Sequence, residues 1–204
     1  MKHIISLLIG YFFGTLNPAA LLSKIKKKDL RRVGTKNLGA TNTMLNFGKR
    51  YGALVLLLDM AKTVVACVLT KLAFPTLTTA TMVAGIGAIL GHIFPFYMKF
   101  KGGKGLAAFA GLVLAFDPIV FLILLVVCTA IMIIVNYSIG MPISAAILFP
   151  FFVGFKTYSV PMIILSAASG LIIIISHFEI ISRIKSNKEN KIRDTMKRMF
   201  AKKS

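Results

Sequence analysis

The polar segment Gly34-Thr-Lys-Asn-Leu-Gly-Ala-Thr-Asn42 is made of residue types that bind anions. Its glycines allow tight turns that expose backbone N–H groups, its Thr and Asn side chains add hydrogen-bond donors, and Lys36 adds a positive charge. Concave groups of N–H donors beside a cation commonly bind phosphate. From the spacing alone, an ordinary loop that ends in a Thr-rich helix start explains this segment equally well.

The segment Lys99-Phe-Lys-Gly-Gly-Lys-Gly105 has the same chemistry, with three lysines and three glycines before an apolar helix. An anion is stabilised at a helix N-terminus, where backbone N–H groups point outward. A Walker loop is excluded, because Gly105 follows Lys104 where Ser or Thr is needed. The two segments together predict a phosphate-binding site without Mg-nucleotide hydrolysis.

Few other side chains could react. His92 stands about two helical turns before the second segment and is a candidate base, although a lone His is more often a packing residue. Asp59 and Lys62 are three apart on one helix face, which predicts a structural ion pair. The six acids allow no catalytic triad or carboxylate pair. Any reaction must therefore depend on an activated substrate, on positioning and on phosphate electrostatics.

Neither a metal site nor a disulfide is expected. The three His residues are dispersed, and Cys67 and Cys128 both lie inside apolar runs, where cysteines are buried packing residues. We therefore expect no metal and no cofactor.

The elements that position these segments belong to a membrane protein. The 204 residues are 57% hydrophobic and contain several apolar runs near the length of a bilayer span. Of the 25 Lys and Arg residues, 21 fall within residues 24–50, 99–104 and 183–203. Clustering of cations beside spans is the positive-inside signal and attracts anionic lipid, so nucleic acid is not an expected partner.

The fold class predicted is a polytopic all-α bundle of about seven transmembrane helices, with the N-terminus outside and the C-terminus cytoplasmic. The runs are approximately 4–23, 53–73, 79–97, 106–116, 119–135, 141–155 and 160–181. The basic tail belongs in the cytoplasm, so the short run 106–116 counts as a crossing unless another run is re-entrant, and five crossings are the alternative. Asp117-Pro118 predicts a new helix start, with Asp as N-cap and Pro at the first position.

The N-terminus resembles a signal peptide, with Asn17-Pro-Ala-Ala20 as a conceivable cleavage region. A single Lys precedes the apolar run and nine cations follow it, so an uncleaved first span is the preferred interpretation. Residues 1–204 are predicted to form one domain, with residues 183–204 as a basic cytoplasmic tail that lies at the membrane surface.

Three stretches, DLRRVGTKNLGATN, GHIFPFYMKFKGGKG and NKENKIR, together resemble the motifs of the integral-membrane acyl-phosphate:glycerol-3-phosphate acyltransferases of bacterial phospholipid synthesis. The similarity covers essentially the whole chain, and the first two motifs are specific in combination. It implies transfer of a fatty acyl group from acyl phosphate to the 1-hydroxyl of glycerol 3-phosphate, giving lysophosphatidic acid and phosphate. It also implies seven helices in the bacterial cytoplasmic membrane.

The resemblance also implies a set of site residues. The implied catalytic residues are Lys104, Asn37, Thr41 and His92, and the implied substrate-binding residues are Arg31, Asn42, Gly102, Gly103 and Asn190. Thr35, Lys36 and Asn187 are added as substrate-binding candidates at positions where the chain differs from the family pattern. The first segment would cradle glycerol phosphate, while Lys104 and the glycine N–H groups would neutralise acyl phosphate. A substrate phosphate would help to deprotonate the hydroxyl. The expected partners are acyl phosphate, glycerol 3-phosphate and membrane lipids, with the chain acting as a monomer.

The chain also departs from the family pattern. Thr35-Lys36 stands where the family usually has Ser-Gly, Leu45 where it has an Arg, and Asn187 where it has a His. Loss of an Arg removes a bidentate phosphate donor, which Lys36 replaces only as a point charge. A diverged paralogue with another phosphorylated acceptor or weak activity is the first alternative. A transporter of organic phosphate is the second, although the spans hold few ionisable residues.

Overall fold

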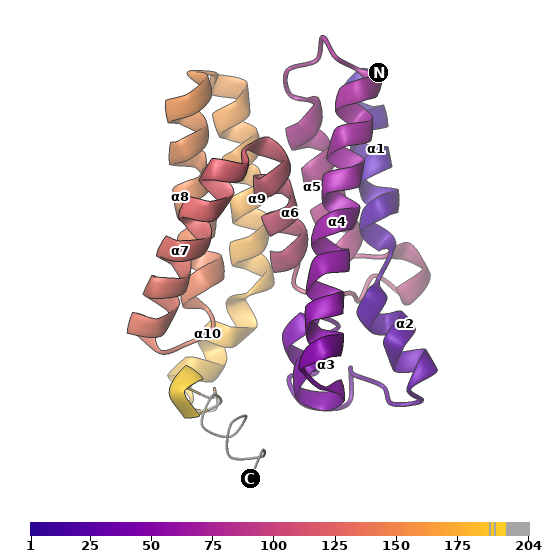
Figure 1. Cartoon of the computed structure of the whole chain (residues 1–204), viewed down its shortest axis with the longest axis vertical. Coiled ribbons are helices and arrows are strands. Elements are labelled where there is room, and N and C mark those ends of the chain that lie inside the picture. The colour runs from indigo at the N-terminus through magenta and orange to yellow at the C-terminus, as the bar shows by residue number, and fades with distance from the viewer. Residues whose placement is uncertain (188, 190, 195–204) are drawn as a thin grey trace. The chain divides into compact units, whose positions relative to one another are not determined.

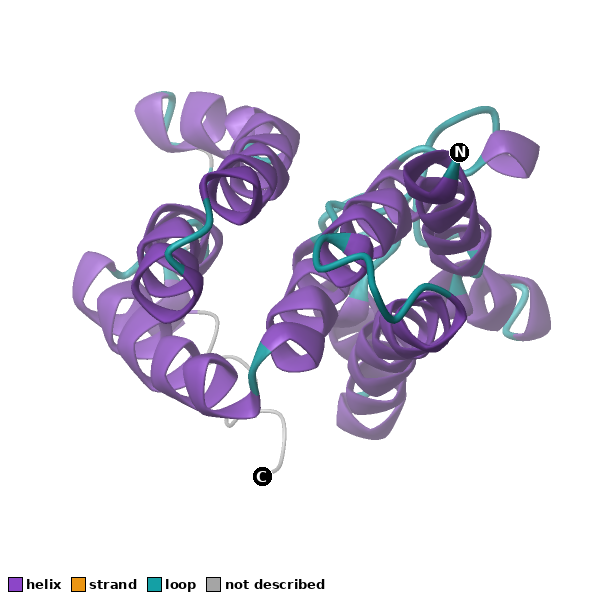
Figure 2. Cartoon of the chain, turned by 90° about the horizontal axis from the view of Figure 1, so that it is seen from above, coloured by secondary structure: helices purple, strands orange, loops and turns teal. Residues whose placement is uncertain are grey.

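The computed structural model describes residues 1–187, 189 and 191–194, and within them every regular element is a helix and none is a strand (Figure 2). The contacts divide the chain into two compact units, Met1–Pro118 and Ile119–Ser204, which are described separately. The prediction of a single domain therefore stays a prediction. Residues 188, 190 and 195–204 of the predicted basic tail lie outside the described part.

The first unit contains the two segments that are predicted to bind anions. Its elements are α1 (Lys2–Thr15), α2 (Pro18–Ile25), α3 (Ala40–Phe47), α4 (Lys49–Ala73), α5 (Ala80–Ile93), the short 3-10 helix η1 (Phe96–Met98) and α6 (Leu106–Phe116). Helices α1, α4 and α5 run side by side, and α2 and α3 both lie near the same end of α4 (Figure 1). The loop before α3 is the first polar segment, and the loop between η1 and α6 is the second.

Glycine pairs bring the backbones of α1 and α5 into contact. Gly10 and Gly14 are four apart on α1, and a Cβ at either would collide with the backbone of Ala84 or Ala88 on α5. Gly87 and Gly91 have the same spacing on α5, and a Cβ there would meet backbone atoms of α1. Small residues at four-residue spacing commonly allow close helix packing in membranes. The hydrophobic effect does not drive helices together in lipid, so their association depends on such van der Waals contacts.

The predicted first span is broken in the middle. Leu16 and Asn17 adopt extended backbone conformations between α1 and α2. The side-chain Oδ1 of Asn17 accepts a hydrogen bond from the N–H of Ala20 at 2.8 Å, and Pro18 occupies the first position of α2. An Asn N-cap followed by Pro is a favourable helix start, so these residues restart the helix within the predicted first span.

The second unit contains α7 (Pro118–Val135), α8 (Gly140–Thr157), α9 (Val160–Ser176) and α10 (Phe178–Lys185). Helices α8 and α9 pack against each other, and a Cβ at Gly170 would lie 2.5 Å from the carbonyl oxygen of Ala146. Helix α7 begins at Pro118 directly after Asp117, which confirms the predicted helix start.

The last predicted span, residues 160–181, is wrong as one continuous helix. It bends by 42° at His177, between α9 and α10. Nδ1 of His177 lies 2.8 Å from the carbonyl oxygen of Ile173 and 3.0 Å from the hydroxyl of Ser176. Polar side chains that bond to nearby backbone groups compete with helix continuation, which explains the break.

The all-helical membrane fold is confirmed. Among the described residues, five helical segments are long and apolar enough to cross a membrane, or six if the bent pair α9 and α10 is one span, and α6 is a shorter apolar helix. All seven predicted runs are thus helical, while the first and last contain breaks that hydropathy does not reveal.

The α1–α5 contact generates a stability prediction. Gly87→Ala should lower the free energy of unfolding by about 1–3 kcal/mol, because the added methyl meets the carbonyl oxygen of Leu7 in α1. Gly154→Ala is the matched control, since its Cβ would meet only the end of the flexible Ile163 side chain, at 3.3 Å. Thermal unfolding in detergent measures both, and equal midpoints would contradict the backbone contact.

Candidate functional site

The loop that carries the first motif folds around the side chain of Asn42. This residue is 0% exposed, and its Nδ2 donates to the carbonyl oxygens of Leu30, Val33 and Asn37 at 2.8, 3.1 and 3.0 Å. Its Oδ1 accepts from the N–H of Thr35 at 2.9 Å and from Nδ2 of Asn46 at 3.0 Å. The side chain predicted to touch substrate is therefore used to shape the loop.

Lys36 has a backbone conformation that favours glycine. Its φ is +56°, in the left-handed region, and Gly34 has a φ of +59°. A side chain in this region costs roughly 1 kcal/mol relative to glycine, which explains why a glycine suits this position in the family pattern. Lys36 thus places an exposed positive charge at a turn where glycine would adopt the same backbone conformation with less strain.

Arg31 is bound by its neighbour Asp29. Nε and Nη2 of Arg31 donate to the two carboxylate oxygens at 3.1 and 3.2 Å. These hydrogen bonds hold the pKa of the Asp29 carboxyl below its ordinary value, so the pair is ionised at neutral pH. Arg31 has five N–H donors, and this fork uses two of them.

The residues at the start of α3 are more open. Thr41 is exposed and Asn37 is half-buried, while Gly39 caps the helix without a side chain that could bond its first N–H groups. Leu45 is 43% exposed and lies one turn after Thr41, hence on the same face. An Arg at position 45 would reach the same side as Thr41, whereas this chain presents an apolar side chain there.

The second motif is fixed to the end of α5. The N–H of Gly102 donates to the carbonyl oxygen of Ile93 at 2.9 Å, and the N–H of Gly103 donates to that of His92 at 3.1 Å. These two N–H groups therefore already have backbone acceptors at the end of α5. The assignment of both glycines to the substrate site stays a prediction.

Gly103 is also where the two motifs meet. A Cβ there would lie 2.6 Å from the carbonyl oxygen of Leu38 in the first motif and would collide with Nε2 of His92. Only a residue without a side chain fits between these groups. Lys104, which follows, is half-buried, and Gly105 caps α6 with a φ of +82°. The contact puts the first-motif loop directly beside the loop of Lys104.

The cluster beneath these loops consists of Asp59, Lys62 and His92. Nζ of Lys62 donates to Oδ1 of Asp59 at 2.6 Å and lies 2.9 Å from Nδ1 of His92. The predicted Asp59–Lys62 pair is thus confirmed, and His92 is its third member. His92 is 3% exposed, which favours a positioning role, and its catalytic role stays a prediction.

Lys62 also bonds to the break in the first span. Its Nζ donates to the carbonyl oxygen of Leu16 at 2.6 Å, and the hydroxyl of Tyr97 donates to that of Thr15 at 2.7 Å. These two carbonyl groups lie where α1 ends and lack helical partners. Sequence reasoning missed both contacts, although Asn17-Pro18 inside an apolar run was a signal of the break.

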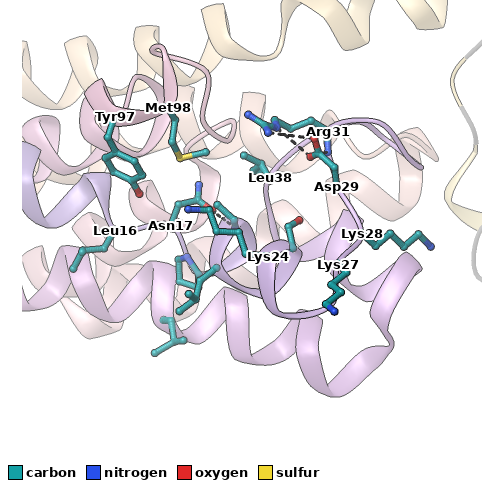
Figure 3. Close-up of a pocket in the computed structure, with 15 residues that line it drawn as sticks. Leu16, Asn17, Lys24, Lys27, Lys28, Asp29, Arg31, Leu38, Tyr97 and Met98 are labelled. Atoms are coloured by element: carbon teal, nitrogen blue, oxygen red, sulfur yellow. Dashed lines mark hydrogen bonds and ion pairs between the residues drawn. The ribbon is translucent and has the colours of Figure 1, made fainter.

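A pocket of about 800 Å³ opens beside this break (Figure 3). It is bordered by Asn17, Lys24, Arg31, Leu38 and Tyr97, among others. Of the predicted site residues, Arg31 alone lines it. The pocket therefore lies next to the motif loops but is formed mainly by other residues.

The third motif belongs to the second unit. Asn187 follows α10, is exposed and has a φ of +54°, which Asn tolerates better than most residues. Asn190 lies outside the described residues. The substrate roles of both stay predictions. Within the described ranges there is no group of three or more His, Cys, Asp or Glu side chains that could hold a metal ion.

The fold and the paired loops define an integral multi-pass membrane protein with a Gly-, Asn- and Lys-containing site at one end of a helix bundle. The family model described as glycerol-3-phosphate acyltransferase matches residues 4–187. The chain belongs to this family.

Relatives in bacteria support the assignment. The glycerol-3-phosphate acyltransferase of Aquifex aeolicus is 32% identical over 191 residues, covering 94% of this chain and all of that protein. The one from Streptococcus sanguinis is 35% identical over 202 residues, covering 94% of this chain and 93% of that protein.

Two crystal structures of PlsY (YgiH), an integral membrane glycerol 3-phosphate acyltransferase, are also similar. The glycerol 3-phosphate form has a TM-score of 0.86 at 31% identity and covers 94% of this chain and 96% of that chain. The lysophosphatidic acid form has a TM-score of 0.83 at 30% identity and covers 94% and 95%.

The hydrogen bonds of Asn42 generate a prediction about loop order. Asn42→Ala should leave the carbonyl groups of Leu30 and Asn37 and one N–H of the loop without their partner, while the carbonyl of Val33 keeps only its bond from the N–H of Lys36. Amide hydrogen exchange of residues 30–37 should then become about tenfold faster. Asn37→Ala is the control, because its side chain makes no hydrogen bond to another described residue. Equal exchange in the two variants would show that Asn42 does not organise the loop.

Proposed function

We propose that this chain transfers a fatty acyl group from acyl phosphate to the 1-hydroxyl of glycerol 3-phosphate, giving lysophosphatidic acid and inorganic phosphate. The observation that carries the proposal is the contact of the two motif loops at Gly103. It brings two sets of anion-binding groups together, as a reaction between two phosphorylated substrates requires.

The acceptor is assigned to the first-motif loop. Asn37 and Thr41 present polar side chains beside the glycine-capped N-terminus of α3, where unpaired N–H groups favour a phosphate. Arg31, Thr35 and Lys36 add donors and positive charge around the same loop. Asn42 acts as a positioning residue, since its polar atoms hold the loop in shape.

The donor phosphate is assigned to Lys104 and the N-terminus of α6. Gly105 caps this helix, so its first N–H groups have no side-chain partner from the cap residue. Lys104 supplies a positive charge beside them. As the acyl carbon–oxygen bond to phosphate breaks, charge grows on the leaving phosphate, and a cation placed there lowers the barrier.

The bond changes need no protein nucleophile. The 1-hydroxyl oxygen of glycerol 3-phosphate attacks the acyl carbonyl carbon, the new ester bond forms, and the bond to the phosphate oxygen breaks. The hydroxyl proton passes to a phosphate oxygen of a substrate. His92 is buried against Asp59 and Lys62, so its place in this scheme is to position Gly103 and the loop around it.

A different phosphorylated acceptor is the second candidate, and the face of α3 favours it. Leu45 puts an exposed apolar side chain one turn after Thr41, where the family pattern has an Arg. An acceptor with a bulkier or more apolar group next to its phosphate would suit this surface better than glycerol 3-phosphate. An organic-phosphate transporter is disfavoured, because the buried Asp59, Lys62 and His92 bond to one another rather than line an ion path.

The reaction itself gives the first functional prediction. Membranes that contain the chain should form lysophosphatidic acid and phosphate from palmitoyl phosphate and glycerol 3-phosphate. The assay should include acyl-CoA as a competing donor and several other phosphorylated acceptors. Absence of product above empty membranes, while a relative is active in the same assay, would reject the proposal. Product with another acceptor alone would favour the second candidate.

Lys104 provides the residue-level prediction. Lys104→Ala should lower turnover about 100-fold or more while the fold is retained, because the charge on the leaving phosphate loses its cation. Lys101→Ala is the matched control, since it removes the same charge from an exposed position in the same loop. Full activity in both variants would show that the loop lysines serve only membrane topology.

A further inference from the structure

The pocket beside the first-span break combines two kinds of surface. Its volume is about 800 Å³, and its wall includes Asn17 and Lys24 as well as Leu16, Leu21 and Leu58. The reaction proposed above assigns no role to any of these five residues. A pocket with a cationic wall and an apolar wall is suited to an amphiphilic anion.

Asn17 contributes a buried donor without a partner. The residue is 7% exposed, and its Oδ1 is used to cap α2. Its Nδ2 has no hydrogen-bond partner among the described residues. Buried polar groups are almost always hydrogen-bonded, so an unpaired amide in a pocket wall indicates a missing acceptor.

The charge around this amide is positive. Lys24, Lys27, Lys28 and Arg31 all line the pocket, and Asp29 is the single acid of the lining residues. Because Asp29 already accepts two side-chain hydrogen bonds from Arg31, it offsets little of the charge of the lysines. In Figure 3, Lys24 lies on the same side of the pocket as Asn17, whereas Lys27 and Lys28 extend away from it.

The apolar wall consists of side chains that face outward. Leu16, Leu21 and Leu58 are 57%, 61% and 44% exposed, and they belong to or border segments long and apolar enough to span a membrane. Exposed leucines on a spanning helix contact acyl chains. The pocket thus has lipid on one side and a cluster of cations on the other.

We propose that this pocket binds the head group of an anionic bilayer phospholipid. A phosphate oxygen accepts a hydrogen bond from Nδ2 of Asn17, Lys24 neutralises its charge, and an acyl chain lies along Leu16, Leu21 and Leu58. The lipid fills the notch where the first span is broken. The site is separate from the residues assigned to the reacting groups, except that Arg31 borders both.

Native mass spectrometry of the full chain in detergent tests this proposal. The chain is titrated with phosphatidylglycerol, with phosphatidylcholine and with lysophosphatidic acid, and the apparent affinities are compared. Asn17→Asp keeps the capping oxygen of α2 but replaces the donor by a negative charge, and Lys24→Gln removes one cation. Lys71→Gln, at the exposed far end of α4, is the control for charge loss. Asn17→Ser, which also retains a capping oxygen, replaces Asn17→Asp if the latter does not fold.

Phosphatidylglycerol should bind the original chain more tightly than phosphatidylcholine. Its affinity should fall about tenfold or more in Asn17→Asp and about fivefold in Lys24→Gln, with no change in Lys71→Gln. Equal phosphatidylglycerol affinity in all variants would overturn the site. Asn17-dependent binding of lysophosphatidic acid alone would overturn the bilayer lipid as occupant and assign the pocket to the product. The measurement needs no turnover, so its result is independent of the acyltransferase assay.

Discussion

An ammonium group buried between helices must satisfy three N–H donors, and the contacts of Lys62 meet this requirement. Its Nζ is in hydrogen-bond distance of the carbonyl oxygen of Leu16, the carboxylate of Asp59 and Nδ1 of His92. The three partners come from the first-span break, from α4 itself and from α5. Removal of any one would leave a buried polar group unpaired, which is costly in an apolar surrounding. The arrangement of α1, α4 and α5 is therefore specified by one side chain as well as by close packing.

The motif loops depend on this cluster through α5. His92 and Ile93 accept the N–H groups of the glycines in the second loop, and Gly103 in turn contacts the first loop at Leu38. The loop lysines and the polar groups of α3 are thus connected to the buried cluster through a short series of backbone contacts. Exposed loops have little rigidity of their own. Attachment of these loops to α5 holds their polar groups in place, which a site that orients two charged substrates requires. The side chain of Asn42 fixes the first loop in a similar way, because it forms hydrogen bonds with backbone groups of that loop.

The sequence predicted those features of the fold that depend on residues close together in the chain. Hydropathy located the helical runs, Asp117-Pro118 located the start of α7, and a spacing of three residues identified the Asp59–Lys62 pair. Features that depend on distant partners were not accessible. The break at Asn17 is supported by a lysine 46 positions from Leu16, and the paired N–H groups of the second loop depend on the end of α5. The sequence motif identified Asn42 as a polar site residue. Only the folded loop shows that its side-chain amide bonds to the backbone of the loop.

The broken first span also bears on how the chain enters the membrane. The carbonyl oxygen of Leu16 finds its partner only when Lys62 is present, and Thr15 finds its partner only when Tyr97 is present. Synthesis delivers the first span before either residue, and an unpaired carbonyl group is unfavourable in lipid. The first span therefore reaches its final shape after insertion, when α4 and η1 have joined it. Biogenesis of this protein is then a sequential assembly, in which the helix made first is completed by segments made after it.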